Sequence, residues 1–507
     1  MPSLLRVKSD RCHFFLILAT AVIASVTLTA ARAQTPASLI IHWDKVTVVS
    51  RSVPTLQVVV NPPLRPGNPL SVASYKAIKD LGADYVRYVP WLPYPKLAVA
   101  ELEPPTPRKT SWDFTLIDPM MKDFFAATNG HPTVINFSTM PAWLFKTDKP
   151  VTYPADPNQV AWNYTQGTEL LHPGGKELGE YYGRLVSWYV NGGFTDEIGV
   201  RHESGYHYKI PVWEVLNEPE GEHSTTPEQY TERYDAIVEG IRRVSPETKF
   251  MGMALEAPRD NPHYFEYFLD PANHKADIPI DYISYHFYAI PTANQTISDW
   301  QYTYFDQADG FLTAVRYIEN IRKRLAPQTK TDTDELGVIS SDDLSQDAPG
   351  HITQPIPPAY WNLAGSLYAY LYIELSKMQI DIIGESQLIG YPTQFPSVSM
   401  MNWITNKPNA RFWVLKLLKD SFQPGDQLVE TSIGSRDLAA QAFLTQGGKK
   451  LLLVNKRSRA LQVDLGSASP GSVLTVDVQS GDGPARAIKP TDGELDLEPF
   501  SVTVVSW

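Results

Sequence analysis

The chain has 507 residues, of which 43% are hydrophobic and 20% charged, a balance typical of folded globular proteins and not of disordered or membrane-spanning ones. Its length suits one large domain together with a small one. The formal net charge of −12 disfavours nucleic acid and anionic membrane surfaces as partners, and it is compatible with neutral substrates such as sugars.

The N-terminal segment predicts a secretory signal peptide over residues 1–33. Basic residues precede the apolar run FFLILATAVIASVTLTA, which ends in the small-x-small cleavage pattern Ala31-Arg32-Ala33. A retained membrane anchor is the alternative, but the run is short for a bilayer span. We therefore expect a secreted or periplasmic protein that has no membrane contact after cleavage.

The only cysteine, Cys12, lies inside this segment. The cleaved chain would therefore have no disulfide, no thiol nucleophile and no cysteine metal site. A chain of this size can rely on its hydrophobic core instead.

Behind the signal segment, residues 34–55 include the strand-like run SLIIHWDKVTVVS. From residue 56 to 423, apolar and β-branched runs alternate with helical patterns, and one predicted helix has Thr226 as N-cap, Pro227 at N1 and Gln229 at N3. The pattern predicts eight strands, at residues 55–61, 83–91, 132–138, 210–219, 249–258, 281–290, 330–339 and 380–386.

Eight strands that alternate with helices predict an α/β fold, a (β/α)8 TIM barrel over residues 56–423. An open doubly wound sheet is the alternative, but VVVNPPLRPGNP after the first strand is not a Gly-rich phosphate-binding loop. After about Pro424, short strand-like runs separated by Gly, Ser, Asp and Pro predict a small C-terminal β-sandwich over residues 424–507. We expect the strands of residues 34–55 to join this sandwich.

In a TIM barrel, catalytic groups lie at the C-terminal ends of the strands. The fourth predicted strand ends in PVWEVLNEPEGEH, where strand alternation and the barrel rule single out Glu218 and leave the other glutamates in supporting or solvated roles. The seventh strand ends near Glu335, and the separation of these two glutamates fits three βα units of roughly 30–45 residues each. Glu385, at the end of the eighth strand, is the alternative partner of Glu218.

Two carboxylates that face each other across a barrel mouth are what glycoside hydrolysis requires. One protonates the leaving oxygen, and the other attacks the anomeric carbon or activates water. This chemistry needs no cofactor and no metal, and the spacing of His202, Glu203 and His207 is not convincing for metal ligands. Near the strand ends, Trp143 and Trp403 are expected to offer flat apolar faces to a sugar ring.

The fourth-strand motif WEVLNEP resembles the Asn-Glu-Pro signature of clan A glycoside hydrolases, and the chain is most similar to glycoside hydrolase family 39, which contains β-xylosidases and α-L-iduronidases. The segments WDFTLIDPMMKDFF, STMPAWLF and YISYHFY and the terminal sandwich support this resemblance in barrel order. It covers most of residues 56–507.

The resemblance implies that Glu218 is the general acid/base and Glu335 the nucleophile of a retaining mechanism, with carboxyl groups about 5–5.5 Å apart. The nearby negative charge is expected to raise the pKa of Glu218. The resemblance also implies four further site residues: Asn217, which matches the asparagine that binds the sugar 2-hydroxyl; Arg87, which matches an arginine that contacts the nucleophile; and His286 and Tyr288, which match groups that flank it.

The sequence departs from the family pattern in two places. The second strand continues as RYVPW where the family has Arg-x-His, and Asp334 precedes Glu335 where the family has threonine. Both changes fall near the sugar that carries the scissile bond. The sugar, the linkage and the choice between exo and endo action therefore stay open, as does the oligomeric state.

The sequence thus predicts a secreted retaining glycoside hydrolase for O-glycosidic bonds, which is β-xylosidase-like or acts on a related oligosaccharide or exopolysaccharide. The first alternative is a catalytically silent carbohydrate-binding protein on the same scaffold, although such a protein has no need to keep both glutamates. The second alternative is a metal-dependent barrel hydrolase.

Overall fold

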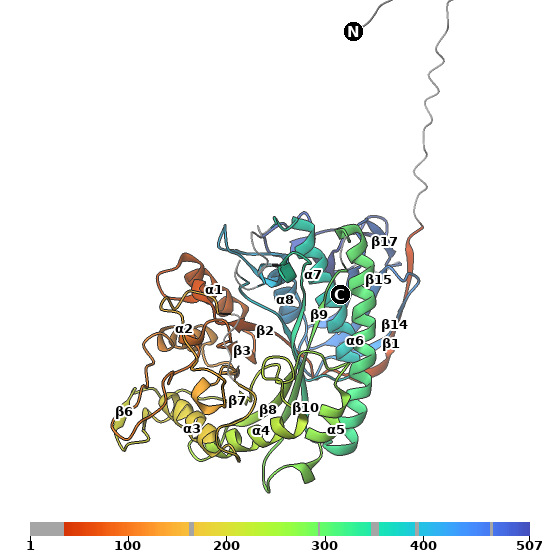
Figure 1. The fold of residues 1–507 in the computed structure, drawn as a ribbon. Helices are drawn as coiled ribbons and strands as arrows, with labels where there is room; N and C mark the ends of the chain where they lie inside the picture. The colour runs from red at the N-terminus through yellow and green to blue at the C-terminus, as the bar shows by residue number, and fades with distance from the viewer. Residues whose placement is uncertain (1–34, 162–166, 293–294, 346–353, 391–394, 467–469) are drawn as a thin grey trace, which may run out of the picture. The chain divides into compact units, whose positions relative to one another are not determined.

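The computed structural model describes residues 35–161, 167–292, 295–345, 354–390, 395–466 and 470–507 (Figure 1). The predicted signal peptide and Cys12 lie outside the described residues. Residues Pro36–Trp507 form one unit. Within the described part of the chain, no helix is both long enough and apolar enough to cross a membrane.

Eight parallel strands close into a barrel, which confirms the predicted fold class. In chain order the strands are β2 (Val53–Val59), β3 (Val86–Val89), β4 (Thr133–Ile135), β7 (Val212–Glu214), β8 (Lys249–Leu255), β9 (Tyr282–Ala289), β10 (Lys330–Val338) and β11 (Ile382–Glu385). Parallel pairing of β11 with β2 closes the barrel. Each strand overlaps one predicted strand, and β2 begins at Val53, ahead of the predicted domain start at residue 56.

Helices cover the outside of the barrel: α1 (Pro69–Leu81), α2 (Asp118–Thr128), α3 (Lys176–Val190), α4 (Pro227–Arg242), α5 (Pro262–Phe268), α6 (Ile297–Leu325), α7 (Pro358–Lys377) and α8 (Ala410–Ser421). The predicted start of α4 is confirmed, because Thr226 and Gln229 form a capping box around Pro227. The pattern did not predict α5, since its 7 residues are too few to show a helical period.

Short elements lie in the connections between these strands and helices. The minor strands are β5 (Gly193–Thr195), β6 (Arg201–Glu203), β12 (Met401–Asn402) and β13 (Lys407–Pro408). The 3₁₀ helices are η1 (Pro62–Leu64), η2 (Pro95–Leu97), η3 (Ala142–Leu144), η4 (Pro271–Asn273), η5 (Asp343–Ser345) and η6 (Pro396–Val398).

The barrel interior changes from apolar to polar along the strands. Side chains alternate between the interior and the surrounding helices with a period of two. An apolar layer lies toward the strand N-termini: Val134, Val212, Met251, Tyr282 and Ile382. Two residues later along several strands come buried polar side chains, among them Asn136, Glu214 and Ser284. The polar groups of the interior therefore gather toward the strand C-termini, where catalytic groups are expected.

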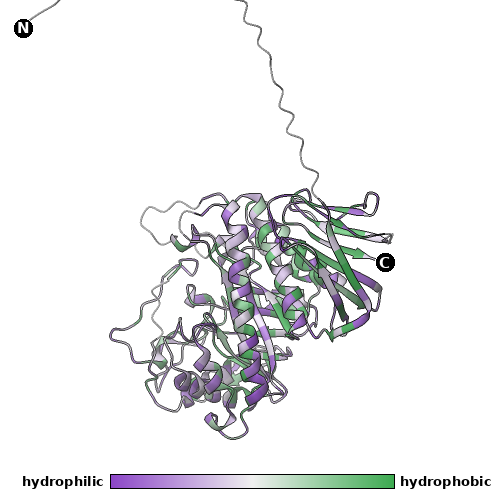
Figure 2. Cartoon of the chain, turned by 90° about the vertical axis from the view of Figure 1, so that its right-hand side faces the viewer, coloured by the Kyte–Doolittle hydropathy of each residue, from purple (hydrophilic) through white to green (hydrophobic). Residues whose placement is uncertain are grey.

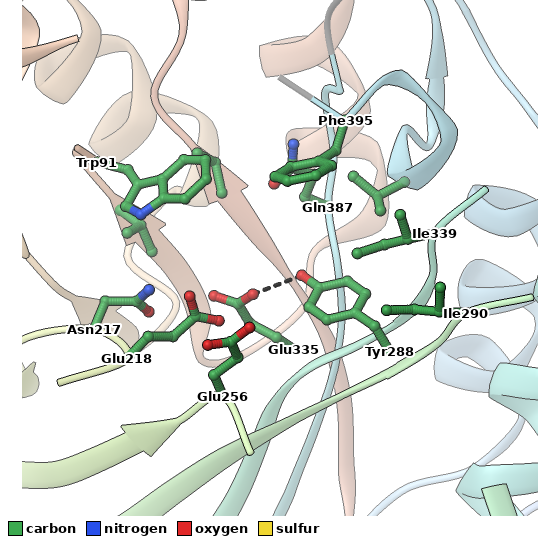
Figure 3. A pocket seen from close by; sticks show the side chains of 13 residues that line it. Trp91, Asn217, Glu218, Glu256, Tyr288, Ile290, Glu335, Ile339, Gln387 and Phe395 are labelled. Atoms are coloured by element: carbon green, nitrogen blue, oxygen red, sulfur yellow. Dashed lines mark hydrogen bonds between the residues drawn. The ribbon is translucent and has the colours of Figure 1, made fainter. Parts of the chain in front are cut away.

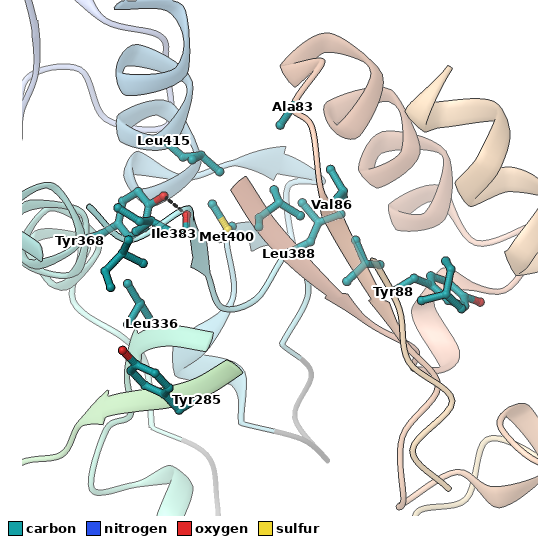
Figure 4. Packing of buried hydrophobic residues seen from close by; sticks show 14 of the residues in the cluster. Ala83, Val86, Tyr88, Tyr285, Leu336, Tyr368, Ile383, Leu388, Met400 and Leu415 are labelled. Carbon is teal, nitrogen blue, oxygen red and sulfur yellow. Dashed lines mark hydrogen bonds between the residues drawn. The ribbon is translucent and has the colours of Figure 1, made fainter. Parts of the chain in front are cut away.

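The opposite faces of the strands pack against the helices. Figure 4 shows Tyr285, Leu336 and Ile383 of the barrel strands beside Tyr368 of α7. The hydroxyl of Tyr368 donates a hydrogen bond of 2.8 Å to the carbonyl oxygen of Ile383, so this helix is fixed to the strand by a polar contact as well as by packing.

The remaining major strands form a nine-stranded sheet in the order β19-β18-β21-β16-β15-β14-β1-β17-β20. Their bounds are β1 (Ala37–Val49), β14 (Gln427–Ile433), β15 (Leu438–Thr445), β16 (Gly448–Asn455), β17 (Leu461–Asp464), β18 (Ser472–Val476), β19 (Arg486–Ala487), β20 (Glu494–Leu497) and β21 (Val502–Ser506). The N-terminal strand β1 joins this sheet, where it pairs antiparallel with β14 and parallel with β17.

The two faces of this sheet bury different surfaces, and its strands are rich in hydrophobic residues (Figure 2). In β15, Leu438, Ala440 and Ala442 face the core of the sandwich itself. The alternate residue Phe443 belongs to the barrel core, and its ring lies 4.3 Å from that of Phe422, which follows α8. The sandwich therefore shares one hydrophobic core with the outer helices of the barrel.

Candidate active site

The turn after β7 gives Glu218 its position. The backbone of Leu216 and Glu218 adopts positive φ angles of 65° and 43°. The amide of Glu218 donates a hydrogen bond of 3.0 Å to the carbonyl of Ala254, which lies in β8. Non-glycine residues in this conformation are strained and persist only where their surroundings hold them, often at functional sites. The turn aims the Glu218 side chain into the barrel mouth.

An irregularity in β10 brings two acidic side chains to the same place. The pairing of β10 shifts register between Asp332 and Glu335 against β9, and between Thr333 and Leu336 against β11. Because an extra residue in a strand re-aims the side chains beside it, both Asp334 and Glu335 reach Arg87. The Arg87 Nε lies 2.9 Å from Asp334 Oδ2, and Nη1 lies 2.6 Å from Glu335 Oε1.

A pocket of about 260 Å³ opens at this end of the barrel (Figure 3). Glu218, Glu335 and a third carboxylate, Glu256, point toward one another on one side of it. The rings of Trp91 and Phe395 lie on the opposite side, with centroids 6.4 Å apart. The other lining residues are Val59, Val89, Asn217, Tyr288, Ile290, Ile339, Gln387 and Val398. The pocket therefore combines reactive acids with aromatic and aliphatic walls.

The guanidinium of Arg87 lies beneath the pocket and is almost fully buried. It donates to Glu335 Oε1 at 2.6 Å, to Asn217 Oδ1 at 2.7 Å and to Gln57 Oε1 at 2.6 Å. Its Nε donates to Glu214 Oε2 at 2.5 Å. Burial lowers the pKa of Arg87, but the charges of Asp334, Glu214 and Glu335 outweigh this effect and keep the pKa well above its ordinary value. One fixed cation thus orients Glu335 and Asn217 together.

Glu335 is held from its other side as well. Tyr288 donates to Glu335 Oε2 at 2.6 Å and lies 2.5 Å from the hydroxyl of Ser386. A carboxylate oxygen of Glu218, a ring nitrogen of His286 and a carboxylate oxygen of Glu335 all lie within 4.8 Å of one another. The two carboxyl groups therefore lie close together, and His286 contacts both of them.

Glu218 has the electrostatic surroundings of a proton donor. Its pKa is raised to about 7, first by burial and then by the charge of Glu335, while its hydrogen bond from His286 opposes the rise. The predicted direction is confirmed, but burial and not the neighbouring charge is the larger cause. Near neutral pH, Glu218 can therefore both give and take a proton.

His286 is positioned between three acids. Its Nδ1 lies 2.8 Å from Glu218 Oε1 and 3.6 Å from Glu335 Oε2, and its Nε2 lies 3.5 Å from Asp334 Oδ1. Burial lowers the pKa of His286, but the charges of Glu335 and Asp334 reverse this effect and raise the pKa well above its ordinary value. His286 is therefore a cationic donor to Glu218.

One group of side chains at the pocket has the spacing of metal ligands. Glu218, His286 and Glu335 are the one group of three suitable side chains found among the described residues. The structure does not bring His202, Glu203 and His207 into such a group within the described residues, and His202 Nε2 instead lies 2.9 Å from Asp196.

Six residues singled out from the sequence meet here. Glu218, Glu335, Asn217 and Tyr288 line the pocket, and Arg87 and His286 bond to them from beneath. Their catalytic and binding roles stay predictions.

Neither Trp143 nor Trp403 lines the pocket. Trp143 lies in η3, donates to the carbonyl of Glu101 at 2.9 Å and packs on the hydrophobic core. Trp403 lies in the connection between β12 and β13 and also packs on the core. Nearness to a strand end along the chain did not decide the direction of these large apolar side chains.

Glu385, the alternative partner of Glu218, is directed elsewhere. It is fully buried, does not line the pocket and accepts a hydrogen bond of 2.8 Å from Arg411 of α8. Its place in the structure is that of a carboxylate that ties β11 to α8.

Four aromatic or polar residues that line the pocket were not among the predicted site residues: Trp91, Glu256, Gln387 and Phe395. Glu256 directly follows β8 and Trp91 follows β3, so the rule that favours strand ends contained a signal for both. Gln387 and Phe395 lie in the long connection after β11, where no periodic pattern predicts which side chains turn inward.

A (β/α)8 barrel with two neighbouring carboxylates at its mouth has the fold and the site of a barrel glycosidase. The family model for glycosyl hydrolases family 39 matches residues 32–336, and the chain belongs to this family. It is therefore a glycoside hydrolase of clan A. Residues 435–505 match the D-apionate lactonase C-terminal immunoglobulin-like domain.

Solved structures support the same fold. The GH51 arabinofuranosidase from Xanthomonas axonopodis pv. citri is 12% identical, with a TM-score of 0.62 over 93% of this chain and 99% of that chain. The family 51 alpha-L-arabinofuranosidase AbfB from Bifidobacterium longum is 13% identical, with a TM-score of 0.62 over 93% of this chain and 99% of that chain. The GH30 endoxylanase from Clostridium papyrosolvens C71 is 12% identical, with a TM-score of 0.53 over 92% of this chain and 99% of that chain. At such identities the likeness shows the fold alone. No curated protein matches the sequence.

Proposed function

We propose that the protein is a secreted retaining glycosidase in which Glu218 is the general acid/base and Glu335 the nucleophile. The observation that carries this proposal is that the two carboxyl groups face the same small space, with one oxygen of each within 4.8 Å of the other. A retaining pair stands about 5–5.5 Å apart, whereas an inverting pair needs roughly 6.5–9.5 Å to admit a water molecule.

In the first step, a carboxylate oxygen of Glu335 attacks the anomeric carbon, and the bond from that carbon to the leaving oxygen breaks. Glu218 gives its proton to the leaving oxygen, so the aglycone departs as a neutral alcohol. In the second step, Glu218 takes a proton from water as the water oxygen attacks the same carbon. The glycosyl–Glu335 bond breaks, and the free sugar leaves with its original anomeric configuration.

The change of role of Glu218 follows from its surroundings. The charge of Glu335 is one of the causes that raise the pKa of Glu218. When Glu335 carries the sugar as an ester, this charge is gone and the pKa of Glu218 falls. Glu218 is then ready to act as a base toward water.

The lining of the pocket favours one neutral sugar ring as the glycon. Its volume of about 260 Å³ lies below the roughly 300–1,000 Å³ typical of small-molecule sites. The charged residues that line it are glutamates, with no Lys or Arg among the described lining residues, and this arrangement repels an acidic sugar. A β-xylosidase-like specificity, or hydrolysis of a related oligosaccharide or exopolysaccharide, suits these features better than a uronide.

Secretion belongs to the same proposal and rests on the N-terminal pattern of residues 1–33. Expression in a host with an intact export pathway, followed by N-terminal sequencing, should give a chain that starts directly after Ala33 in the medium or the periplasm. An intact N-terminus in the cytoplasm would refute secretion without affecting the enzymatic proposal.

The mechanism is tested with Glu218→Ala and Glu335→Ala on a panel of 4-nitrophenyl glycosides and oligosaccharides. Both variants should lose activity, and loss of the acid/base should cost roughly 10²–10⁴-fold in rate. Azide should rescue Glu335→Ala with an inverted glycosyl azide and Glu218→Ala with a retained one. The matched control is Glu203→Ala, which removes an exposed carboxylate outside the pocket. Wild-type rates in both glutamate variants would refute the assignment.

A further inference from the structure

The side-chain amide of Asn217 is fixed by two hydrogen bonds. Its Oδ1 accepts from Arg87 Nη2 at 2.7 Å, and its Nδ2 donates to Glu222 Oε1 at 2.9 Å. An asparagine amide has two N–H donors on its nitrogen. The bond to Arg87 sets which way the amide faces, and the bond to Glu222 uses one donor. The other donor remains for a ligand in the pocket that Asn217 lines.

The same oxygen of Glu222 has a second donor. It accepts a hydrogen bond from the indole Nε1 of Trp91, a residue on the aromatic side of the pocket. Figure 3 shows the indole nitrogen on the edge of Trp91 that is nearer to Asn217. The Glu222 side chain is only 6% exposed, so neither bond has water as a ready competitor. A single buried oxygen therefore connects the aromatic wall with the amide beside Glu218.

We propose that Glu222 is a positioning residue: it presents the Asn217 amide to the 2-hydroxyl of the glycon and holds Trp91 over the sugar ring. This inference rests on the proposed function, in which Asn217 binds that hydroxyl next to the acid/base. Hydrogen bonds to the 2-hydroxyl strengthen in the transition state of glycoside hydrolysis, so the orientation of this amide affects the rate of reaction.

Glu222 acts in this role as a neutral acceptor. Burial raises its pKa well above the ordinary range, and the charges of Glu218 and Glu335 add to this effect, although the bonds from Asn217 and Trp91 oppose it. Its Oε2 faces Nε2 of His223 at 3.8 Å. That ring is neutral, because burial lowers the pKa of His223 to about 3. A glutamine at position 222 would offer the same carbonyl oxygen to both donors.

The kinetic test uses the best 4-nitrophenyl glycoside for the wild type and its 2-deoxy analogue, and the readout is the ratio of their kcat/KM values. Glu222→Leu should reduce the preference for the 2-hydroxy substrate roughly tenfold or more, since it frees the amide that recognises this hydroxyl. Glu222→Gln should restore the preference. Trp91→Phe, which removes only the indole donor, should lower kcat/KM for both substrates equally and leave the ratio unchanged.

An unchanged ratio in Glu222→Leu would overturn the proposal, since a merely structural residue slows both substrates alike. The proposal would also be overturned if Glu222→Gln lost as much of the preference for the 2-hydroxy substrate as Glu222→Leu does, since the acid itself would then be required. Circular dichroism and the melting temperature establish that each variant is folded. If Glu222→Leu does not fold, the isosteric Glu222→Gln variant keeps the test valid.

A second readout does not need activity. In protein labelled with ¹⁵N-tryptophan, the indole N–H resonance of Trp91, assigned through Trp91→Phe, should move in Glu222→Leu and stay in place in Glu222→Gln. If the wild type hydrolyses no glycoside on the panel, the proposed function fails while this resonance still tests the bond. If the resonance does not move in Glu222→Leu, the inference fails while the results for Glu218 and Glu335 stand.

Discussion

Arg87 and His286 balance the acidic residues around the pocket. Arg87 contacts Glu214, Asp334 and Glu335, and all three carboxylates are buried with it. Burial raises the pKa of Glu214 to about 7 although Arg87 opposes the rise. Asp334 is the opposite case, since Arg87 and His286 overcome its burial and lower its pKa to about 2. Two cations thus face Asp334 and Glu335, while Glu214 can hold a proton.

Arg87→Met should destabilise the fold as well as abolish activity. The substitution keeps the length of the side chain but leaves buried carboxylates without their cation, a change that costs about 3–5 kcal/mol. Urea denaturation measures the loss in the free energy of unfolding. Gln57→Leu, which removes a neutral partner of Arg87, is the control and should cost less. Equal free energies of unfolding for Arg87→Met and the wild type would contradict this prediction, since the buried carboxylates would then not depend on the cation.

The pH dependence of kcat/KM should report the protonation of Glu218. A general acid works in its protonated form, and the pKa of Glu218 is about 7, so kcat/KM should fall as the pH rises through about 7. This limb should disappear for Glu218→Ala with a 2,4-dinitrophenyl leaving group, which departs without protonation. An unchanged limb in that variant would assign it to another residue.

The strand-end rule placed Glu218 and Glu335 at the barrel mouth, the first in the turn after β7 and the second inside β10. Glu218 and Glu335 follow from their places in the chain, and the resemblance added Asn217, Arg87, His286 and Tyr288. The rule failed for side chains in the connections. Trp143 turns into the core because burial of its large apolar surface outweighs its position. Phe395 enters the pocket from a connection whose path depends on the finished fold.

Among the elements, α3 and α4 pack with their backbones in contact. A Cβ on Gly240 would lie 1.9 Å from the carbonyl oxygen of Gly179, and a Cβ on Gly179 would lie 2.2 Å from that of Ala236. Real Cβ atoms do not approach so closely, so the absence of side chains at these two positions sets the distance between the helices. The helix α4 follows the turn that carries Glu218, so this packing also supports the site.

Gly240→Ala should therefore destabilise the protein, while Gly310→Ala should not. Both glycines lie in helices, α4 and α6, where alanine by itself gains roughly 0.5–1 kcal/mol. At Gly310 the nearest atom to a new Cβ is the end of Arg259 at 3.6 Å, so the gain should appear as a higher melting temperature. At Gly240 the helices must separate, and the melting temperature should fall. Equal effects of the two substitutions would refute this account of the packing.

At this scale the sequence predicted all eight barrel strands, because apolar runs of strand length recur between helical patterns. Even the polar run of β10 was placed correctly. Its register shift at Asp332–Glu335 was not predicted, since a bulge depends on how the neighbouring strands pair. The parallel pairing of β1 with β17 was missed for the same reason, because a local period contains no information on a partner far along the chain.

In the molecule as a whole, barrel and sandwich share a hydrophobic core and should unfold together. The neighbours Leu452 and Leu453 of β16 point to opposite faces, the first into the barrel core and the second into the core of the sandwich. Leu→Ala at either position should lower the free energy of unfolding by about 2–5 kcal/mol and with it the melting temperature. The protein should still unfold in a single transition. Coincident urea curves from tryptophan fluorescence and far-UV circular dichroism test this. A separate early transition in Leu453→Ala alone would show that the sandwich unfolds independently.

The pairing of β1 with β14 has a consequence for the order of events during biosynthesis. Leu39 pairs with Ile433, so the first described strand acquires its partner only when nearly the whole polypeptide is available. Contacts between such distant segments form slowly, and until they form the edges of β14 and β17 remain open. Of the described strands, β1 is synthesised first but is among the last to find its partners. An unfinished chain lacks the strand that β1 pairs with, an order of events that is compatible with the proposed secretion.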